Sequence, residues 1–229
     1  MAAVTYNWGP LLTADERESL SSQGHEVSYP PGTVVIRRGE RSAFVLYLID
    51  GHMKAVSPAS GVILGLHGPD SVVGELALMA SESRTADVIT IGAVNALILP
   101  SAVWVDFVRS NARAACAHWA DLARRQVGLD DVKGLSFTSS EHRVARALVN
   151  LAEAGIGVTT PDGTQFTGIS QQDIAGIAKV SRDSASVILR RFREAGIVST
   201  GRQKLLVIDM DAVHAIYERE SDEEHERAE

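Results

Sequence analysis

Short runs of apolar residues, each long enough for a single β-strand, fill the first half of the chain. They span residues 34–36, 44–49, 53–56, 62–64, 86–89 and 96–99. Glycines such as Gly39, Gly51 and Gly92 fall between the runs, as expected where a chain turns between strands. Many short, evenly spaced strands predict an antiparallel barrel or jelly roll for this part of the chain.

A proline-free stretch over residues 101–135 follows and predicts a long helix. Apolar or small residues recur there with heptad spacing, in the two series Val108, Ala115, Leu122, Leu129 and Val105, Ala112, Trp119. Heptad spacing places these side chains on one helix face. A helix of roughly 30 residues extends about 45 Å, more than one small domain needs, so we expect the face to pair with a second copy of the chain. Packing of the same face on the β-rich part alone is the alternative.

Residues 139–217 carry the capping signals of a second domain. Ser170 and Asp173 form a capping box before one amphipathic run, and Ser181 caps the next. Two short helices joined by a tight turn predict a helix-turn-helix. The apolar run 198–208, interrupted by polar residues, predicts a β-hairpin beside it. Together these elements predict a winged helix.

Composition narrows the class of protein. The chain is 45% hydrophobic and 22% charged, and no apolar run approaches the roughly 18 residues that span a bilayer. The first residues lack the basic start and apolar core of a secretion signal, so we expect a cytoplasmic protein with no membrane partner. The single cysteine, Cys116, excludes an internal disulfide and an iron–sulfur cluster. We expect no metal or haem, and we expect His118 to be an ordinary surface histidine, because it has no second ligand at helical spacing.

The net charge of −7 is spread unevenly. Residues 218–229 hold seven acidic and two arginine side chains, a balance of −5, with so few apolar residues that we expect a disordered acidic tail. Residues 179–204 hold seven basic and two acidic side chains, a balance of +5. Because local charge decides where a phosphate backbone docks, this second segment is the candidate nucleic-acid surface. A solvated basic face is the alternative.

One short segment carries the residues of an anion site. It contains Gly74, Glu75, Leu76 and Ala77, followed by Arg84 and Thr85. A helix beginning at Gly74 would direct unpaired backbone N–H groups toward an anion such as a phosphate. Arg84 would add charged donors and Thr85 one hydroxyl, whereas the Glu75 carboxylate suits a sugar hydroxyl. An ordinary surface ion pair between Glu75 and Arg84 is the alternative interpretation.

The G-E-L-A-L sequence at 74–78, with R-T-A at 84–86, resembles the phosphate-binding cassette of the CRP/FNR family of transcription regulators. A second motif agrees with the first. I-S-Q-Q-D-I-A at 169–175, with V-S-R-D at 180–183, resembles the helix-turn-helix of the same family. The resemblance spans residues 11–217, which is nearly the whole chain.

The resemblance implies an α+β protein in four parts. They are an antiparallel, jelly-roll-like, cyclic-nucleotide-binding β-roll at 11–100, a dimerisation helix at 101–135, a winged helix-turn-helix DNA-binding domain at 139–217 and a disordered acidic tail at 218–229. It also implies a homodimeric, allosteric regulator that binds pseudo-palindromic double-stranded DNA, contacts RNA polymerase and responds to a cyclic nucleotide, with cyclic AMP the first choice. Nothing in the sequence indicates catalysis. The alternative is a regulator that needs no ligand, or responds to cyclic GMP or a cyclic dinucleotide, and uses the β-roll as an interaction module.

The residues expected on DNA lie on and around the second helix of the helix-turn-helix. They are Ser170, Gln171, Ser181, Arg182, Asp183, Ser184, Ser186, Arg190, Arg191, Arg202 and Lys204. Arg182 can donate two hydrogen bonds to a guanine edge, and Asp183 can accept one from a cytosine amino group. Arg190 and Arg191 suit phosphates, which position a protein but carry no sequence information. Where related regulators carry a second base-reading arginine this chain has Val187, so we expect a different operator.

The resemblance also places Gly128 and Leu129 where relatives contact the base of the nucleotide. Neither side chain can donate a hydrogen bond to a base, so the sequence leaves the base open. Gly128 lowers helix stability by about 1 kcal/mol relative to alanine. We therefore hypothesise that the helix beyond Val127 becomes ordered when a ligand packs against Leu129.

Overall fold

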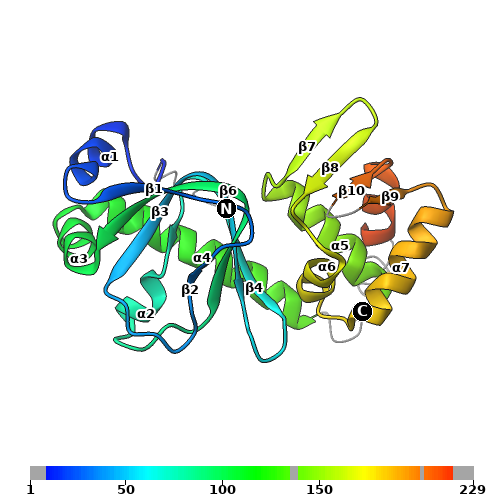
Figure 1. The fold of residues 1–229 in the computed structure, drawn as a ribbon, viewed down its shortest axis with the longest axis horizontal. Helices are drawn as coiled ribbons and strands as arrows, with labels where there is room; N and C mark the ends of the chain where they lie inside the picture. Colours follow the sequence, from blue (N-terminus) through cyan, green and yellow to red (C-terminus); the bar gives the residue numbers. More distant parts are fainter. Residues whose placement is uncertain (1–8, 135–138, 202–203, 219–229) are drawn as a thin grey trace, which may run out of the picture.

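The computed structural model describes residues 9–134, 139–201 and 204–218, and in the first of these ranges it describes side chains up to residue 124. Figure 1 shows two lobes side by side: a β-rich lobe formed by the first half of the chain, and a second lobe formed by residues 139–218. We refer to them as the β lobe and the helical lobe. Helix α4 (Ala112–Gly134) extends from the first lobe toward the second.

The β lobe is built on one antiparallel sheet, which contains six strands within the described residues. The strands are β1 (His25–Tyr29), β2 (Val34–Ile36), β3 (Phe44–Val56), β4 (Ile63–His67), β5 (Val72–Val73) and β6 (Asp87–Pro100). β1, β6, β3 and β4 lie side by side in that order, while β2 pairs with β6 and β5 pairs with β3. Every one of these pairs is antiparallel, which confirms the predicted class of sheet.

Two of these strands are longer than the sequence predicts. Turns are expected at Gly51 and Gly92, but β3 and β6 each continue through their glycine. Both glycines have positive φ, 81° and 73° respectively, and the β3–β6 register shifts between Leu48 and His52. A Cβ on Gly51 would lie 2.3 Å from the Ala93 carbonyl oxygen, so only glycine fits there. The glycines therefore form bulges that bend one long ribbon instead of separating short strands.

The helices of the β lobe are α1 (Ala14–Ser21), α2 (Glu75–Met79), α3 (Ser101–Ser110) and α4. The prediction of one uninterrupted helix over 101–135 is wrong, because Asn111 has an extended backbone (φ −124°, ψ 92°) and separates α3 from α4. The break also divides the heptad series between the two helices. Val108 on α3 packs against the core cluster of the β lobe that contains the buried Trp104, whereas Trp119 on α4 is 76% exposed.

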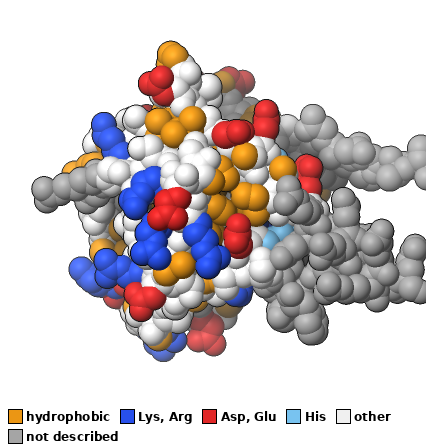
Figure 2. All heavy atoms as spheres, turned by 90° about the vertical axis from the view of Figure 1, so that its right-hand side faces the viewer, with side chains coloured by type: hydrophobic (Ala, Val, Ile, Leu, Met, Phe, Trp, Pro, Cys, Tyr) orange, Lys and Arg blue, Asp and Glu red, His pale blue; other side chains and the backbone are white. Residues whose placement is uncertain are grey.

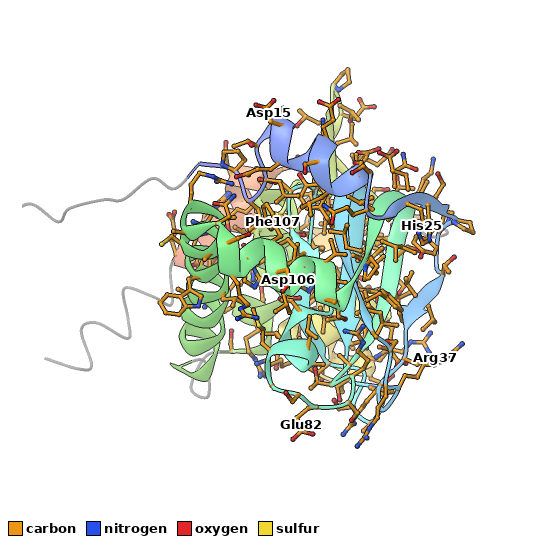
Figure 3. All side chains as sticks on the ribbon, turned by 90° about the vertical axis from the view of Figure 1, so that its left-hand side faces the viewer. Asp15, His25, Arg37, Glu82, Asp106 and Phe107 are labelled. Carbon is orange, nitrogen blue, oxygen red and sulfur yellow. The ribbon has the colours of Figure 1, made fainter. Side chains whose placement is uncertain are left out.

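Side chains near the N-terminal end of the chain bind the residues at the break between α3 and α4. Asn111 caps α4 by accepting from the Ala114 amide (3.0 Å), and its side chain donates to Glu16 (2.5 Å), which also pairs with Arg113. Burial raises the pKa of Glu16, but hydrogen bonds from the Thr13 backbone, Asn111 and Arg113 outweigh it and hold the pKa below its ordinary value. Figure 3 shows α3 in front of the strands with α1 above it. The start of the chain thus stabilises the junction of α3 and α4.

The helical lobe contains the predicted winged helix-turn-helix. Its elements are α5 (Ser140–Glu153), β7 (Gly157–Thr160), β8 (Gly163–Thr167), α6 (Gln171–Ala178), α7 (Arg182–Glu194), β9 (Val198–Gly201) and β10 (Lys204–Val207), followed by helical residues 210–218. The capping box is confirmed: Ser170 Oγ accepts from the Asp173 amide (3.1 Å), and Asp173 accepts from the Ser170 amide (3.0 Å). Ser181 caps α7. The strands form a sheet in the order β7-β8-β10-β9 beside a core that includes the fully buried Phe166.

The expectation for His118 is wrong. Only 1% of the residue is exposed, and its ring meets Trp104 edge-on with the ring centres 5.7 Å apart. Packing between α3 and α4, which the helix pattern alone does not show, buries it. Within the described ranges, no helix combines the length and the apolar character needed to cross a bilayer. Those same residues contain no group of three His, Cys, Asp or Glu side chains arranged to hold a metal ion.

Candidate functional site

The segment that resembles a phosphate-binding cassette lies between β5 and β6. As the sequence predicts, α2 begins at Glu75, directly after Gly74. Gly74 has a φ of +93°, and a Cβ there would lie 2.6 Å from Arg84 Nη1. Both the backbone conformation and the close approach of the arginine therefore require glycine. Glu75 and Ala77 face the protein interior, whereas Leu76 is 53% exposed.

Arg84 lies at the centre of this segment and is buried. Its Nε donates to Ser42 Oγ (2.9 Å), and its Nη2 donates to the carbonyl oxygens of Phe44 (2.5 Å) and Ser42 (3.1 Å). Nη1 donates to the Gly74 carbonyl oxygen, and the guanidinium carbon lies 5.2 Å from the centre of the Phe44 ring. Burial lowers the pKa of Arg84, while the nearby carboxylates oppose that shift. The arginine thus ties separate stretches of backbone together, and its donors face protein atoms.

A cavity of about 60 Å³ lies beside the cassette. Its walls include Ile36, Ala55, His67, Glu75, Arg84 and Thr85. The three polar residues of the predicted cassette are therefore brought together here. Ala55 and His67 are not expected from the sequence, because only the pairing of β3 with β4 brings them to the cassette. Pockets for small molecules commonly measure about 300 Å³ or more, so a nucleotide is larger than the space that these walls enclose.

The two residues expected near the nucleotide base are Gly128 and Leu129. Both fall within α4, whose backbone is helical there. The Leu129 side chain and the surroundings of both positions lie outside the described residues. Their part in base recognition, and the ordering of the helix by a ligand, stay predictions.

The predicted DNA-reading side chains of α7 are turned outward. The exposed residues along this helix include Arg182, Asp183, Ser186, Val187, Arg190 and Arg191. Ser181 and Ser184 serve the cap, because Ser181 Oγ accepts from the Ser184 amide (3.0 Å) and lies 2.8 Å from the Ser184 hydroxyl. Arg190 lies 4.0 Å from Glu194 and Arg191 lies 3.8 Å from Glu141. No described residue forms an ion pair with Arg182, so its donors face solvent.

Two hollows flank α7 and join it to neighbouring elements. One, of about 130 Å³, is lined by residues that include Gln171, Ser186, Arg190, Arg193 and Thr200, from α6, α7 and β9. The other, of about 480 Å³, is lined by residues that include Ser139, Ser140, Glu141, Asp183, Val187 and Arg191, from the start of α5 and from α7. The sequence does not predict Ser139, Ser140, Glu141 or Thr200 at this surface, because only tertiary packing brings α5 and β9 to α7.

The remaining predicted DNA contacts lie around the same surface. Ser170 and Gln171 are exposed at the start of α6, and Lys204 is exposed on β10. Arg202 lies outside the described residues. Figure 2 faces the side of the molecule where α7 lies and shows Lys and Arg side chains grouped there, with acidic and apolar side chains among them. The surface is therefore locally basic although the chain as a whole is acidic.

Two family models match the chain, one in each lobe. A cyclic nucleotide-binding domain matches residues 26–111, and a Crp-like helix-turn-helix domain matches residues 142–216. The first match contains the whole cassette and the walls of the cavity. The second contains the helix-turn-helix and the β9–β10 hairpin.

Relatives extend over both lobes. The cAMP-activated global transcriptional regulator CRP of Escherichia coli is 26% identical over 204 residues, which cover 87% of this chain and 97% of that protein. The cyclic AMP receptor protein of Thermus thermophilus is 27% identical over 194 residues, which cover 83% of this chain and 87% of that protein. Each of these alignments therefore extends over parts of both matched domains of this chain.

A solved structure shares the fold. The c-di-GMP responsive global regulator CLP of Xanthomonas campestris superposes with a TM-score of 0.74 at 21% identity, covering 86% of this chain and 100% of that one. These proteins are regulators of transcription and not enzymes. Both domain matches, their order and the α+β fold lead to one conclusion: the chain belongs to the CRP/FNR family of DNA-binding transcription regulators and carries a cyclic nucleotide-binding domain.

Proposed function

We propose that this protein is a homodimeric transcription regulator whose DNA binding is controlled by cyclic AMP in the β lobe. The observation that carries the proposal is the cassette itself. Gly74, Glu75, Arg84 and Thr85 surround one cavity in a cyclic nucleotide-binding domain, in a chain whose relatives include cAMP-activated regulators. Residues 11–100 form the nucleotide-binding part and 139–217 the DNA-binding part of this proposal, with the tail at 218–229 outside both.

Ligand binding would change the partners of Arg84. The guanidinium would exchange the Gly74 and Phe44 carbonyl oxygens for the cyclic phosphate, which offers stronger, charge-assisted hydrogen bonds. Glu75 would accept from a ribose hydroxyl, and the exposed Thr85 would add a donor to the phosphate. Leu76 and Ala77 would offer backbone N–H groups at the start of α2. Gly128 and Leu129 would border the base from α4.

The dimer would form through α4. Trp119 exposes 76% of its surface, and such a large exposed aromatic side chain on a helix marks a surface that a partner covers. Ala112, Ala115 and Leu122 follow the same heptad spacing on this helix. Trp119→Ala is expected to shift the protein from dimer to monomer in sedimentation at micromolar concentration. A wild type that sediments as a monomer would contradict the dimer.

On DNA, Arg182 and Asp183 of each protomer would read base edges in the major groove. Ser170, Gln171, Ser186, Arg190, Arg191, Arg202 and Lys204 would contact phosphates or neighbouring base edges. Two protomers related by two-fold symmetry fit a pseudo-palindrome whose half-sites are about 34 Å apart. RNA polymerase is the further partner that we propose.

A second candidate function keeps DNA binding and changes the ligand. Four of the five guanidinium N–H groups of Arg84 donate to protein atoms, and the cavity measures only about 60 Å³; both observations favour a β lobe that acts without a ligand, as an interaction module. Cyclic GMP or a cyclic dinucleotide is the other possibility in this class. The structural neighbour CLP is described as responsive to c-di-GMP.

Calorimetry with cyclic AMP, cyclic GMP and cyclic di-GMP separates these functions. We expect cyclic AMP to bind the wild type. The losses of affinity caused by Glu75→Gln and Thr85→Ala should together amount to at least tenfold, because each substitution removes a polar partner of the sugar or phosphate. Glu82→Gln, an exposed change on the same loop, is the control. A gel-shift titration on selected random DNA, with and without nucleotide, measures the response. The absence of binding heat for every nucleotide would favour the ligand-free function.

A further inference from the structure

Strands β3 and β4 form a ribbon between the cavity and the helical lobe. Ala55 and His67 lie on one face of this ribbon and line the cavity. Because successive side chains of a strand point to opposite faces, His52, Lys54 and Leu66 lie on the other. The register pairs Lys54 directly with Leu66. Figure 1 shows β4 and α6 on the facing sides of the two lobes.

The outer face of the ribbon contacts the helical lobe through polar and apolar groups. Lys54 Nζ donates to Asp173 Oδ1 at 2.5 Å, and the two side chains are only 13% and 12% exposed. His52 Nε2 donates to the carbonyl oxygen of Ala154, at the end of α5 (2.9 Å). Leu66 packs against the apolar core of the helical lobe. The contact is therefore continuous and largely excluded from water.

Asp173 serves two structures at once. Its Oδ2 accepts from the amide (3.0 Å) and the hydroxyl (2.8 Å) of Ser170, which completes the cap of α6. Its Oδ1 binds Lys54 of the β lobe. The capping box explains the first role from sequence, but nothing in the helix-turn-helix motif requires the second. One carboxylate thus joins the first helix of the DNA-binding motif to the ribbon.

Gly176 allows the two lobes to approach closely. A Cβ on this residue would lie 2.5 Å from the Gly61 carbonyl oxygen and 3.3 Å from the Ile63 amide nitrogen. The three nearest atoms all belong to the β lobe, and none belongs to the helical lobe. Inside a helix, glycine is less favourable than alanine. The glycine at this position therefore serves the contact between the lobes and not α6 itself.

The size of the cavity relates this contact to ligand binding. A volume of about 60 Å³ is well below the roughly 300 Å³ of a common small-molecule site, and the ribbon is one of its walls. The Ile36, Val73 and Val88 side chains on other walls are part of the close-packed β-lobe core. A nucleotide that widened the cavity would press on two other walls, α2 with Thr85 on one side and the ribbon on the other, and the outer face of the ribbon holds α6.

We propose that the contact of Lys54, His52 and Gly61 with Asp173, Ala154 and Gly176 is an intramolecular latch that nucleotide binding releases. The latch rests on the proposed function, since its effector is the cyclic nucleotide of the cassette. It holds the helical lobe against the ribbon while the cavity is narrow, and a widened cavity breaks it. Because the two events compete, weakening the latch strengthens nucleotide binding, and nucleotide binding weakens the latch by the same factor.

Two substitutions test the latch by different physical routes. Gly176→Ala adds a Cβ whose three nearest atoms outside the backbone of α6 belong to the β lobe, and alanine is more favourable than glycine inside a helix. Lys54→Met removes the ion pair and keeps the length of the side chain. Calorimetry with cyclic AMP should show affinity raised about fivefold or more by Gly176→Ala, and in the same direction by Lys54→Met. The loss of a positive charge by itself would weaken binding of an anion, so a gain separates the latch from simple electrostatics.

Arg109→Met is the matched control, because it removes a positive charge from an exposed pair with Asp106 on α3. It should leave nucleotide affinity within about twofold of wild type. Unchanged or weaker binding by both latch variants, with a wild type that binds, overturns the latch and leaves the proposed function intact. Heat in the latch variants alone supports a latch that holds the cavity shut. No heat in any protein overturns the proposed effector and the latch together.

Discussion

The cassette of the β lobe and the α7 surface of the helical lobe use their arginines in opposite ways. Arg84 is buried and donates to protein carbonyl oxygens, whereas Arg182 is exposed and pairs with no described residue. Under the proposed function, an anion at Arg84 would compete with these hydrogen bonds, whereas a DNA base edge would meet the exposed donors of Arg182 directly. In this proposal the first site rearranges when it binds its ligand, and the second binds DNA without rearrangement. This difference suits a regulator in which ligand binding does the conformational work.

The largest effect should come from removing Arg84. In Arg84→Ala, the backbone carbonyl oxygens of Gly74 and Phe44 lose their donor, and the buried Glu75 loses the positive charge beside it. We expect the free energy of unfolding of the β lobe to fall by about 2 to 4 kcal/mol. Urea unfolding followed by tryptophan fluorescence measures it. Arg41→Ala, an exposed change nearby, is the control. An unchanged midpoint would contradict the structural role of Arg84.

Arg182→Ala, unlike Arg84→Ala, should change DNA recognition and leave the stability of the fold unaltered. We expect no change in unfolding, because the side chain is exposed, and a loss of about 1 to 3 kcal/mol in discrimination at one base pair. Binding to the selected operator and to its single-base variants, measured at fixed salt, tests this. A uniform loss on all sequences would reassign Arg182 to the phosphate backbone.

Acid should lower the stability of the β lobe by protonating Glu16. Because its pKa is lowered in the folded protein, its carboxylate adds stability that is full above its unfolded pKa of about 4.3 and is lost as pH falls through the lower, folded pKa. The difference in unfolding free energy between wild type and Glu16→Gln should therefore be constant near pH 7 and shrink below about pH 4.3. A difference that stays constant down to pH 3 would show that the Glu16 charge contributes nothing.

The smallest effect is expected from Arg191→Ala. Arg191 is exposed and lies 3.8 Å from Glu141, and a surface ion pair at this distance adds little to stability. We expect slightly weaker binding to every DNA sequence and a slope of log affinity against log salt that is reduced by about 1. An unchanged slope would remove Arg191 from the phosphate contacts, and a sequence-dependent loss would move it to the bases.

The helical lobe follows its local sequence signals closely. Ser170 and Ser181 cap the helices that the sequence assigns to them, because a cap depends on atoms within a few residues. The β lobe departs from prediction where longer-range contacts decide. Gly51 reads locally as a turn, but the pairing of β3 with β6 carries the strand through it. Asn111 interrupts the heptad series because its side chain binds Glu16 from the distant α1.

Short-range periodicity, capping and contiguous motifs were enough to predict the α+β class, the helix start at Gly74 and the helix-turn-helix. The side-chain contacts of these segments depend instead on the tertiary structure. It turned Arg84 toward the Gly74 and Phe44 carbonyl oxygens, and it brought Lys54 to Asp173, a residue 119 positions away. Such pairs follow from the packing of whole strands and helices, which no local pattern encodes.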